Sequence, residues 1–163
     1  MTIGEKYMKI KKSFLDYSME FICLLTMIGT IAYMVVMWPY VPEQIPVHFN
    51  GAGLIDKMGN KNEIFILLIG TWFMYLFLSA VGKIPASWNT GVRSGMKDKL
   101  RVYMAVRHLI STSKCIVVLI LTYMTIQSLR ISDLGSYFMV VSIGIVFINL
   151  SYWMIKLFKA NKR

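Results

Sequence analysis

Four long runs of apolar residues, separated by shorter polar segments, dominate this 163-residue chain. Hydrocarbon offers no water to backbone groups, so a segment that crosses a bilayer is a helix of about 20 apolar residues. Each run is apolar on nearly every side, unlike a surface helix of a soluble domain. The pattern predicts an all-α integral membrane protein, a bundle of four transmembrane helices. The predicted spans cover about residues 18–40, 63–82, 109–129 and 134–155.

The composition agrees with a lipid environment. Hydrophobic residues make up 56% of the chain and charged residues 16%, whereas soluble domains are about a quarter charged. Cys23 and Cys115 both fall inside apolar runs and fit no paired metal spacing, so we interpret them as packing residues. The first run follows several lysines, like a secretory signal, but it is too long and lacks a small-residue cleavage site. We therefore expect an uncleaved membrane anchor.

The net charge of +10 is unevenly distributed. Basic residues cluster before the first span, between the second and third, and after the fourth, whereas the first and third connections hold only Lys57, Lys61 and Arg130. Because basic residues favour the cytoplasmic side, we expect both termini in the cytoplasm. The charge also suits anionic lipid headgroups. No nucleic-acid-binding motif accompanies it, so we expect the lipid bilayer and no nucleic acid as a partner.

The predicted cytoplasmic loop, residues 83–108, contains a helical pattern near its end. From residue 97 to residue 114, across the start of the third span, polar residues recur at helical steps on one side, in the series Lys97, Arg101, His108, Ser111 and Lys114. This predicts an amphipathic cytoplasmic helix that runs directly into the third span, with its basic face on the membrane surface. We interpret His108 as a surface residue and expect Lys114 to extend to the interface.

Packing inside the bundle is predicted from small and weakly polar residues. In the first span, Cys23, Thr26, Gly29 and Thr30 gather on one side, which favours close helix contact. Asn149 in the fourth span is costly in lipid, so we expect it to point inward. We find no convincing ionisable group at mid-membrane and no broken helix, which disfavours a transport pathway.

The predicted outer loop, residues 39–62, carries strong conformational signals. Three prolines end the first helix and keep the chain extended. Residues 46–50 alternate in polarity and predict a short strand. Residues 56–59 predict a turn, with Asn60 or Asn62 as the N-cap of the second span. We expect a structured Pro/Gly-rich loop that caps the outer ends of the helices.

This loop contains the spaced motif Pro42-x-x-Ile45-Pro46-x-His48-Phe49-Asn50-x-x-Gly53-x-x-Asp56-x-x-Gly59-x-Lys61. A second patch reads Pro85-x-x-Trp88-Asn89, followed by Arg101-x-Tyr103 and Arg107. Together, over roughly the first two thirds of the chain, they resemble the domain-of-unknown-function family DUF1648, which is related to the SdpI-type immunity proteins. Val41 stands where that family commonly has Leu.

The resemblance implies a protein of the bacterial cytoplasmic membrane. SdpI-type proteins protect a toxin producer from its own secreted toxin, and they also bind a transcriptional repressor at the membrane. They carry further helices after this domain, whereas this sequence ends after its fourth predicted span.

We therefore expect a non-enzymatic, cofactor-free binding protein, with a peptide toxin, an envelope protein or a cytoplasmic regulator as partner, and homo-oligomerisation left open. The candidate contacts in the outer loop are Glu43, Pro46, His48, Phe49, Asn50, Gly53, Asp56 and Lys61. Those in the cytoplasmic loop are Trp88, Asn89, Arg101, Tyr103 and Arg107.

Two alternatives remain open. The first is a metal-binding membrane enzyme in which His48 and Asp56, with Glu43, bind a cation. They are weak candidates, because a catalytic zinc site normally needs three protein ligands of defined geometry. The second alternative is an accessory subunit of a transporter.

Overall fold

The computed structural model describes residues 11–84, 88 and 96–161. The described residues are mostly helical (75%), and four of their helices are long and apolar enough to cross a membrane. This length and composition indicate a multi-pass membrane protein. The four are α1 (Phe14–Met37), α2 (Ile64–Val81), α3 (Met96–Arg130) and α4 (Phe138–Asn161).

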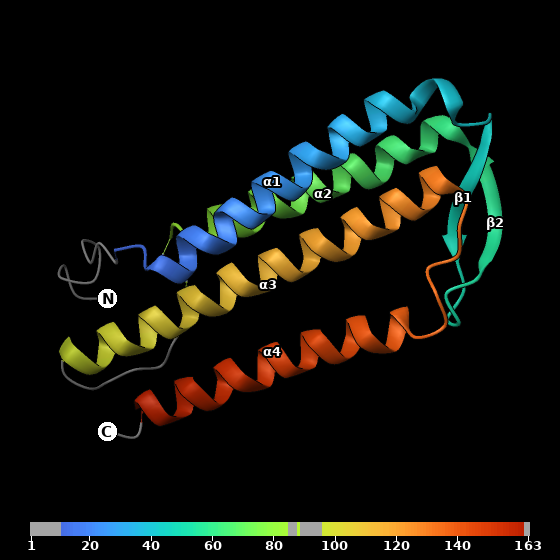
Figure 1. Cartoon of the computed structure of the whole chain (residues 1–163). Helices are drawn as coiled ribbons and strands as arrows, with labels where there is room; N and C mark the ends of the chain where they lie inside the picture. The colour runs from blue at the N-terminus through green and yellow to red at the C-terminus, as the bar shows by residue number, and fades with distance from the viewer. Residues whose placement is uncertain (1–10, 85–87, 89–95, 162–163) are drawn as a thin grey trace.

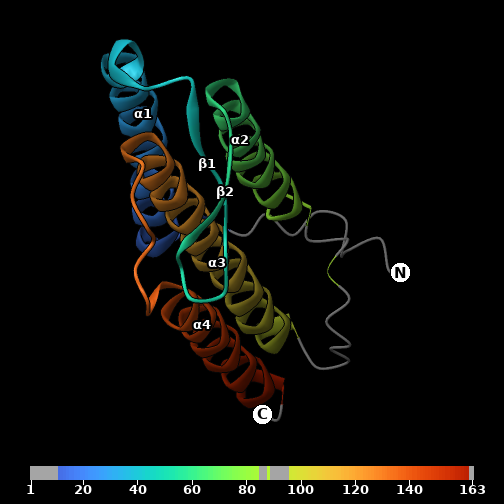
Figure 2. The same ribbon diagram turned by 90° about the vertical axis from the view of Figure 1, so that its right-hand side faces the viewer.

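Helix α3 is the centre of the bundle. Helices α1, α2 and α4 each pack mainly along α3, and Figures 1 and 2 show α3 lying between them. The β strands lie across one end of the helices, which we call the hairpin end (Figure 1). The start of α1, the end of α2 and the end of α4 lie at the opposite end, the polar end (Figure 1).

The loop between α1 and α2 forms a β-hairpin. Strands β1 (Gln44–Phe49) and β2 (Ile55–Asn60) are antiparallel, with Gln44 opposite Asn60 and Phe49 opposite Ile55. The connecting turn is held by Asn50, whose Oδ1 accepts from the N–H groups of Ala52 at 2.9 Å and Leu54 at 3.1 Å. The strand predicted at residues 46–50 thus lies within or beside β1, whereas the turn predicted at 56–59 is wrong. Those residues form β2, because Asn50 starts the turn earlier.

Short caps and 3₁₀ turns set the ends of the helices. Ser13 caps α1 in a reciprocal capping box with Asp16, an arrangement that satisfies free N–H groups of the first turn. At the hairpin end, α1 passes into the 3₁₀ turn η2 (Trp38–Tyr40), which contains Pro39. Asn60 caps the 3₁₀ turn η3 (Lys61–Glu63), which leads into α2. The predicted N-cap Asn60 therefore begins the helical segment one turn before α2 itself.

Two apolar clusters hold the helices together. One, near the middle, joins α1, α2 and α3 through buried residues that include both cysteines: Cys23, Met27, Tyr75, Cys115 and Val118. The other joins the root of the hairpin to the helix ends through Met34, Val41, Ile45, Ile64 and Leu129. Both cysteines are free thiols in this packed interior. Among the described residues, the close helix contact predicted at Gly29 is absent, since a Cβ there would meet nothing within 4 Å.

Helix α4 is attached to α3 partly by a polar contact. Asn149 Nδ2 donates to Ser113 Oγ at 2.9 Å, so the predicted inward orientation of Asn149 is confirmed. Replacing Asn149 with leucine removes this bond, and we expect a loss of about 0.6 kcal/mol, the average for interhelical hydrogen bonds in membranes. SDS-titrated unfolding in mixed micelles measures it. Ser151→Leu, at an exposed position of the same helix, is the control and should change stability less.

Candidate functional site

The hairpin is fixed to the loop between α3 and α4. Leu134 N donates to Gly53 O at 2.8 Å, and Ile55 N donates to Asp133 Oδ1 at 2.8 Å. Gly53 has a positive φ of 75°, and a Cβ there would lie 2.4 Å from Gly135 O. Only glycine fits this left-handed backbone and close approach. Gly53, a predicted contact residue, is therefore buried and serves to dock the hairpin.

The root of the hairpin is anchored by buried and paired residues. Pro46 is fully buried beside Ile45, so the structure places this predicted contact residue in the core. Lys61 Nζ lies 2.7 Å from Glu43 Oε1, and Lys61 N donates to Glu43 O at 2.9 Å. The same ammonium lies over the Trp38 ring, 5.4 Å from its centroid, which adds a cation–π contact. These interactions connect the start of β1 to the start of α2.

The outer side of the hairpin carries the exposed members of the predicted set. His48 Nδ1 lies 2.6 Å from Asp56 Oδ1, across the two strands, with side chains 66% and 38% exposed. Phe49 is half-buried and Asn50 holds the turn. Lys57 and Met58, which the sequence did not single out as contacts, are exposed beside Asp56. This side presents charge and apolar surface together on a fixed scaffold.

The metal hypothesis has a partial basis in geometry. His48 and Asp56 lie together as predicted, but Glu43 pairs with Lys61 instead. Over residues 11–84, 88 and 96–161, no group of three or more His, Cys, Asp or Glu side chains is placed to hold a metal ion. A catalytic zinc site usually takes three protein ligands. The pair by itself is therefore better described as a cross-strand hydrogen-bonded pair than as a metal centre.

The residues predicted in the cytoplasmic loop are divided by the structure. Trp88 is buried, donates from Nε1 to Val81 O at 2.9 Å and packs against Tyr103 at 5.9 Å between ring centroids. Arg101 is exposed. Arg107 is turned into the bundle, where it meets α1. Asn89 lies outside the described residues.

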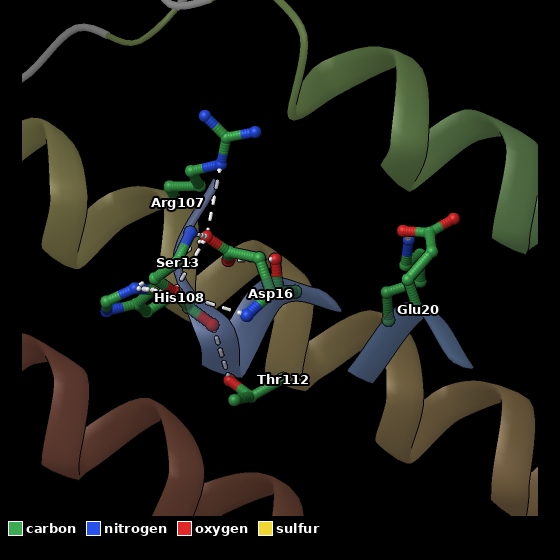
Figure 3. A network of polar contacts seen from close by, with 8 residues as sticks. Ser13, Asp16, Glu20, Arg107, His108 and Thr112 are labelled. Atoms are coloured by element: carbon green, nitrogen blue, oxygen red, sulfur yellow. Dashed lines mark hydrogen bonds and ion pairs between the residues drawn. The ribbon is translucent and has the colours of Figure 1, made fainter. Parts of the chain in front are cut away.

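A polar cluster at the polar end centres on Asp16 of α1 (Figure 3). Its Oδ2 accepts from Ser13 N at 2.8 Å and lies 3.4 Å from Arg107 Nε, and its Oδ1 accepts from Ser111 Oγ at 2.8 Å. His108 Nε2 lies 2.8 Å from Ser13 Oγ. The interpretation of His108 as a surface residue is wrong, since its side chain is 18% exposed. It faces α1 because the capped start of that helix offers a hydrogen-bond partner.

A second ion pair lies one turn further into the bundle. Lys114 Nζ is 2.7 Å from Glu20 Oε2 and 3.0 Å from Ser79 Oγ, and Tyr75 OH donates to Glu20 Oε1. Lys114 is only 4% exposed. The expectation that it extends to the interface is therefore wrong: a carboxylate on α1 draws it inward. This pair lies between three helices, but Glu20 is in the second turn of α1, near the polar end. It therefore does not contradict the expectation that no ionisable group lies at mid-membrane.

These two pairs border a cavity of about 200 Å³ between α1, α2 and α3. Four cationic and two acidic side chains line it, together with serines, Tyr75 and aliphatic residues of α2 and α3. The charged lining residues are Lys12, Asp16, Glu20, Lys83, Arg107 and Lys114. The cavity is thus a charged recess at one end of an otherwise apolar bundle.

Sequence reasoning missed Asp16 and Glu20, although a signal was present. The two acids are four residues apart and so lie on one face of α1. Arg107, Ser111 and Lys114 are spaced by four and three residues and so share one face of α3, which makes the two faces complementary in charge. The predicted first span, residues 18–40, contains Glu20 at its start, but neither acid was compared with the basic residues that precede the third span.

Comparison with known proteins agrees with the resemblance of the outer loop. Residues 25–78 match the model of the family described as "Domain of unknown function (DUF1648)". This segment contains most of α1, the whole hairpin and most of α2, but neither Asp16 nor Glu20. No curated protein and no solved structure matches the chain.

Proposed function

We propose that this chain is a non-enzymatic membrane protein that recognises a peptide or protein partner with its hairpin, in the manner of SdpI-type immunity proteins. The observation that carries this proposal is the exposed strand β2. Its neighbour β1 packs against α3, whereas residues 56–58 of β2 are all exposed. Across the described ranges the sheet has two strands, so β2 pairs with β1 alone.

An exposed edge strand suits an extended peptide. Ile55 N already donates to Asp133 Oδ1, so a further strand would be added beyond it, along residues 56–60 of β2. An edge strand accepts such a strand through its backbone groups, and its side chains then select the sequence that is added. Beside this edge lie Asp56, Lys57 and Met58, with His48 across the pair. A partner with charges complementary to this pattern and an apolar residue opposite Met58 fits the surface.

The scaffold behind the edge reduces the cost of binding. Gly53 and Ile55 are tied to the α3–α4 loop, and Ile45 is fully buried at the root. A surface already held in its binding conformation loses little freedom when a partner binds. This preorganisation distinguishes the hairpin from a slack connecting loop.

The distribution of charge supports an outward-facing hairpin. The polar end carries Lys12, Lys83, Arg107, Lys156 and Lys159, whereas the hairpin end holds Lys57, Lys61 and Arg130. Basic residues favour the cytoplasmic side of a membrane. In this orientation both termini are cytoplasmic and β2 faces the medium, where secreted toxins and envelope proteins are met.

Survival of a toxin-sensitive bacterium tests the proposal. Cells that produce the chain are challenged with medium from bacteria that secrete peptide toxins, and we expect higher survival than in cells with an empty vector. The variant Asp56→Lys/Lys57→Glu keeps the net charge but reverses the pattern on β2, so it should lose the protection.

The matched control is Lys159→Glu, an exposed position at the polar end. It should protect like the unaltered chain at equal expression. Equal protection by the β2 variant would contradict recognition by this edge, and no protection from any toxin tested would contradict the immunity role.

A further inference from the structure

We propose that the cavity between α1, α2 and α3 binds a phosphate group, and that its occupant is the headgroup of an anionic phospholipid. The cavity lies at the polar end, away from the hairpin, so this inference does not rest on recognition by β2. It is carried by three observations, namely the charge of the lining, the depth of the cavity and the apolar surface beside it.

The lining has an excess of positive charge that the protein itself does not neutralise. Asp16 and Glu20 are both engaged, one with Arg107 and hydroxyl groups, the other with Lys114 and Tyr75. Lys12 and Lys83 also line the cavity, and both are exposed. Among the residues that the structure describes, no carboxylate lies within ion-pair distance of either lysine. The cavity therefore retains two lysines for an anion.

The two lysines suit a phosphate group, since lysine binds phosphate as a flexible point charge. Ser79 and Ser111 add polar surface to the same cavity. Both hydroxyl groups are fixed by the buried ion pairs, since Ser79 Oγ accepts from Lys114 and Ser111 Oγ donates its proton to Asp16. The volume of about 200 Å³ admits a headgroup phosphate but not a folded partner.

The depth of the cavity favours a lipid as the source of the phosphate. At 1.5 Å per residue, Glu20 and Lys114 lie about 25 Å from the hairpin-end termini of α1 and α3. The hydrocarbon core is about 30 Å thick, so this pair lies just inside the far boundary. Lys12 and Lys83, at the cavity mouth, then reach the level of the phospholipid headgroups.

The apolar surface beside the cavity favours the same source. Leu76, which lines the cavity, is 58% exposed, and Phe73 and Phe77 on the same helix are 63% and 51% exposed. A lipid whose phosphate enters the cavity has acyl chains that lie along such a surface. A dissolved phosphate ion would gain nothing from it.

Lipid retention tests the proposal. The full chain is reconstituted in nanodiscs of phosphatidylcholine with a minor share of phosphatidylglycerol, then transferred to mild detergent, and the retained lipids are measured by native mass spectrometry. We expect phosphatidylglycerol to be retained in preference to phosphatidylcholine. Lys12→Gln/Lys83→Gln should lower this preference roughly thirtyfold, because each lysine contributes electrostatic attraction to an anionic headgroup.

The control variant is Lys156→Gln/Lys159→Gln, which removes two exposed lysines of α4 at the same end. It should retain the preference, since neither residue lines the cavity. Far-UV circular dichroism confirms that the variants keep their helices. Equal losses in the two double variants, or no preference in the unaltered chain, would overturn a lipid site.

A second arm distinguishes dissolved phosphate from lipid. Inorganic phosphate is added to the chain in nanodiscs of phosphatidylcholine alone, and ³¹P line broadening reports binding. Broadening that Lys12→Gln/Lys83→Gln abolishes, without any lipid preference, supports the phosphate site with dissolved phosphate as its occupant. If the unaltered chain shows no phosphate broadening and no lipid preference, the proposal is overturned altogether.

Discussion

Replacing Lys114 with methionine is expected to destabilise the bundle by about 3 kcal/mol, because it leaves the Glu20 carboxylate among three helices without its cation. The side chain of Lys114 is 5% exposed and that of Glu20 is 27% exposed, which places the effect at the lower end of the range for a broken buried pair. Methionine keeps the length and apolar character of the side chain, so little packing is lost. The midpoint of SDS-titrated unfolding in mixed micelles, followed by circular dichroism, measures the change.

Two further variants separate the lost ion pair from lost packing. In Glu20→Gln/Lys114→Met both charges are removed, and we expect most of the stability to return, because a neutral amide still accepts from Tyr75. Lys156→Met removes an exposed lysine that contacts the Tyr152 ring, and it should change stability by no more than about 0.5 kcal/mol. If the double variant were as unstable as Lys114→Met, the interpretation as an uncompensated charge would fail.

The membrane-spanning helices were predictable, because spanning a membrane depends on local properties. A run of about 20 apolar residues is visible in any window of the sequence, and the four candidate spans follow from it. Asn149 was also predictable, since a lone amide in lipid seeks a partner. Each of these inferences requires one segment and its solvent, and no knowledge of which helices are neighbours.

The polar cluster was not predicted, because it depends on which helices are neighbours. Lys114 is an interface residue if α3 is considered alone, and it becomes a buried partner only when Glu20 lies opposite. The surface position predicted for His108 was wrong for the same reason, since Ser13 contacts it from the start of α1. Helix spacing alone places each residue on a face but leaves open what that face meets.

The hairpin was predicted only in part. The sequence predicted a rigid loop and a strand near residues 46–50, but it placed the turn at 56–59. Glycine and aspartate there are typical of turns, yet Asn50 and the left-handed Gly53 form the turn instead. The contact of Gly53 with Gly135 decides this choice, and it joins parts of the chain that are distant in sequence.

Replacing Gly53 with alanine is expected to release the hairpin from the α3–α4 loop. An alanine at φ 75° is strained. Its Cβ would lie 2.4 Å from Gly135 O, a backbone atom that cannot move aside as a flexible side chain could. With a cost of about 2 kcal/mol for the local contact, exchange of the Leu134 amide, which donates to Gly53 O, should become roughly thirtyfold faster. Hydrogen–deuterium exchange in detergent micelles measures it.

Gly51→Ala is the matched control for this substitution, in the same turn. Gly51 does not have a positive φ, and a Cβ there would meet nothing within 4 Å. In Gly51→Ala, the exchange rate of the Leu134 amide should stay close to that of the unaltered chain or fall slightly, because alanine restricts the unfolded chain. If Gly53→Ala left Leu134 as protected as Gly51→Ala does, the two glycines would be equivalent. The hairpin would then not depend on the α3–α4 loop for its position, and the argument for a preorganised recognition edge would lose its structural basis.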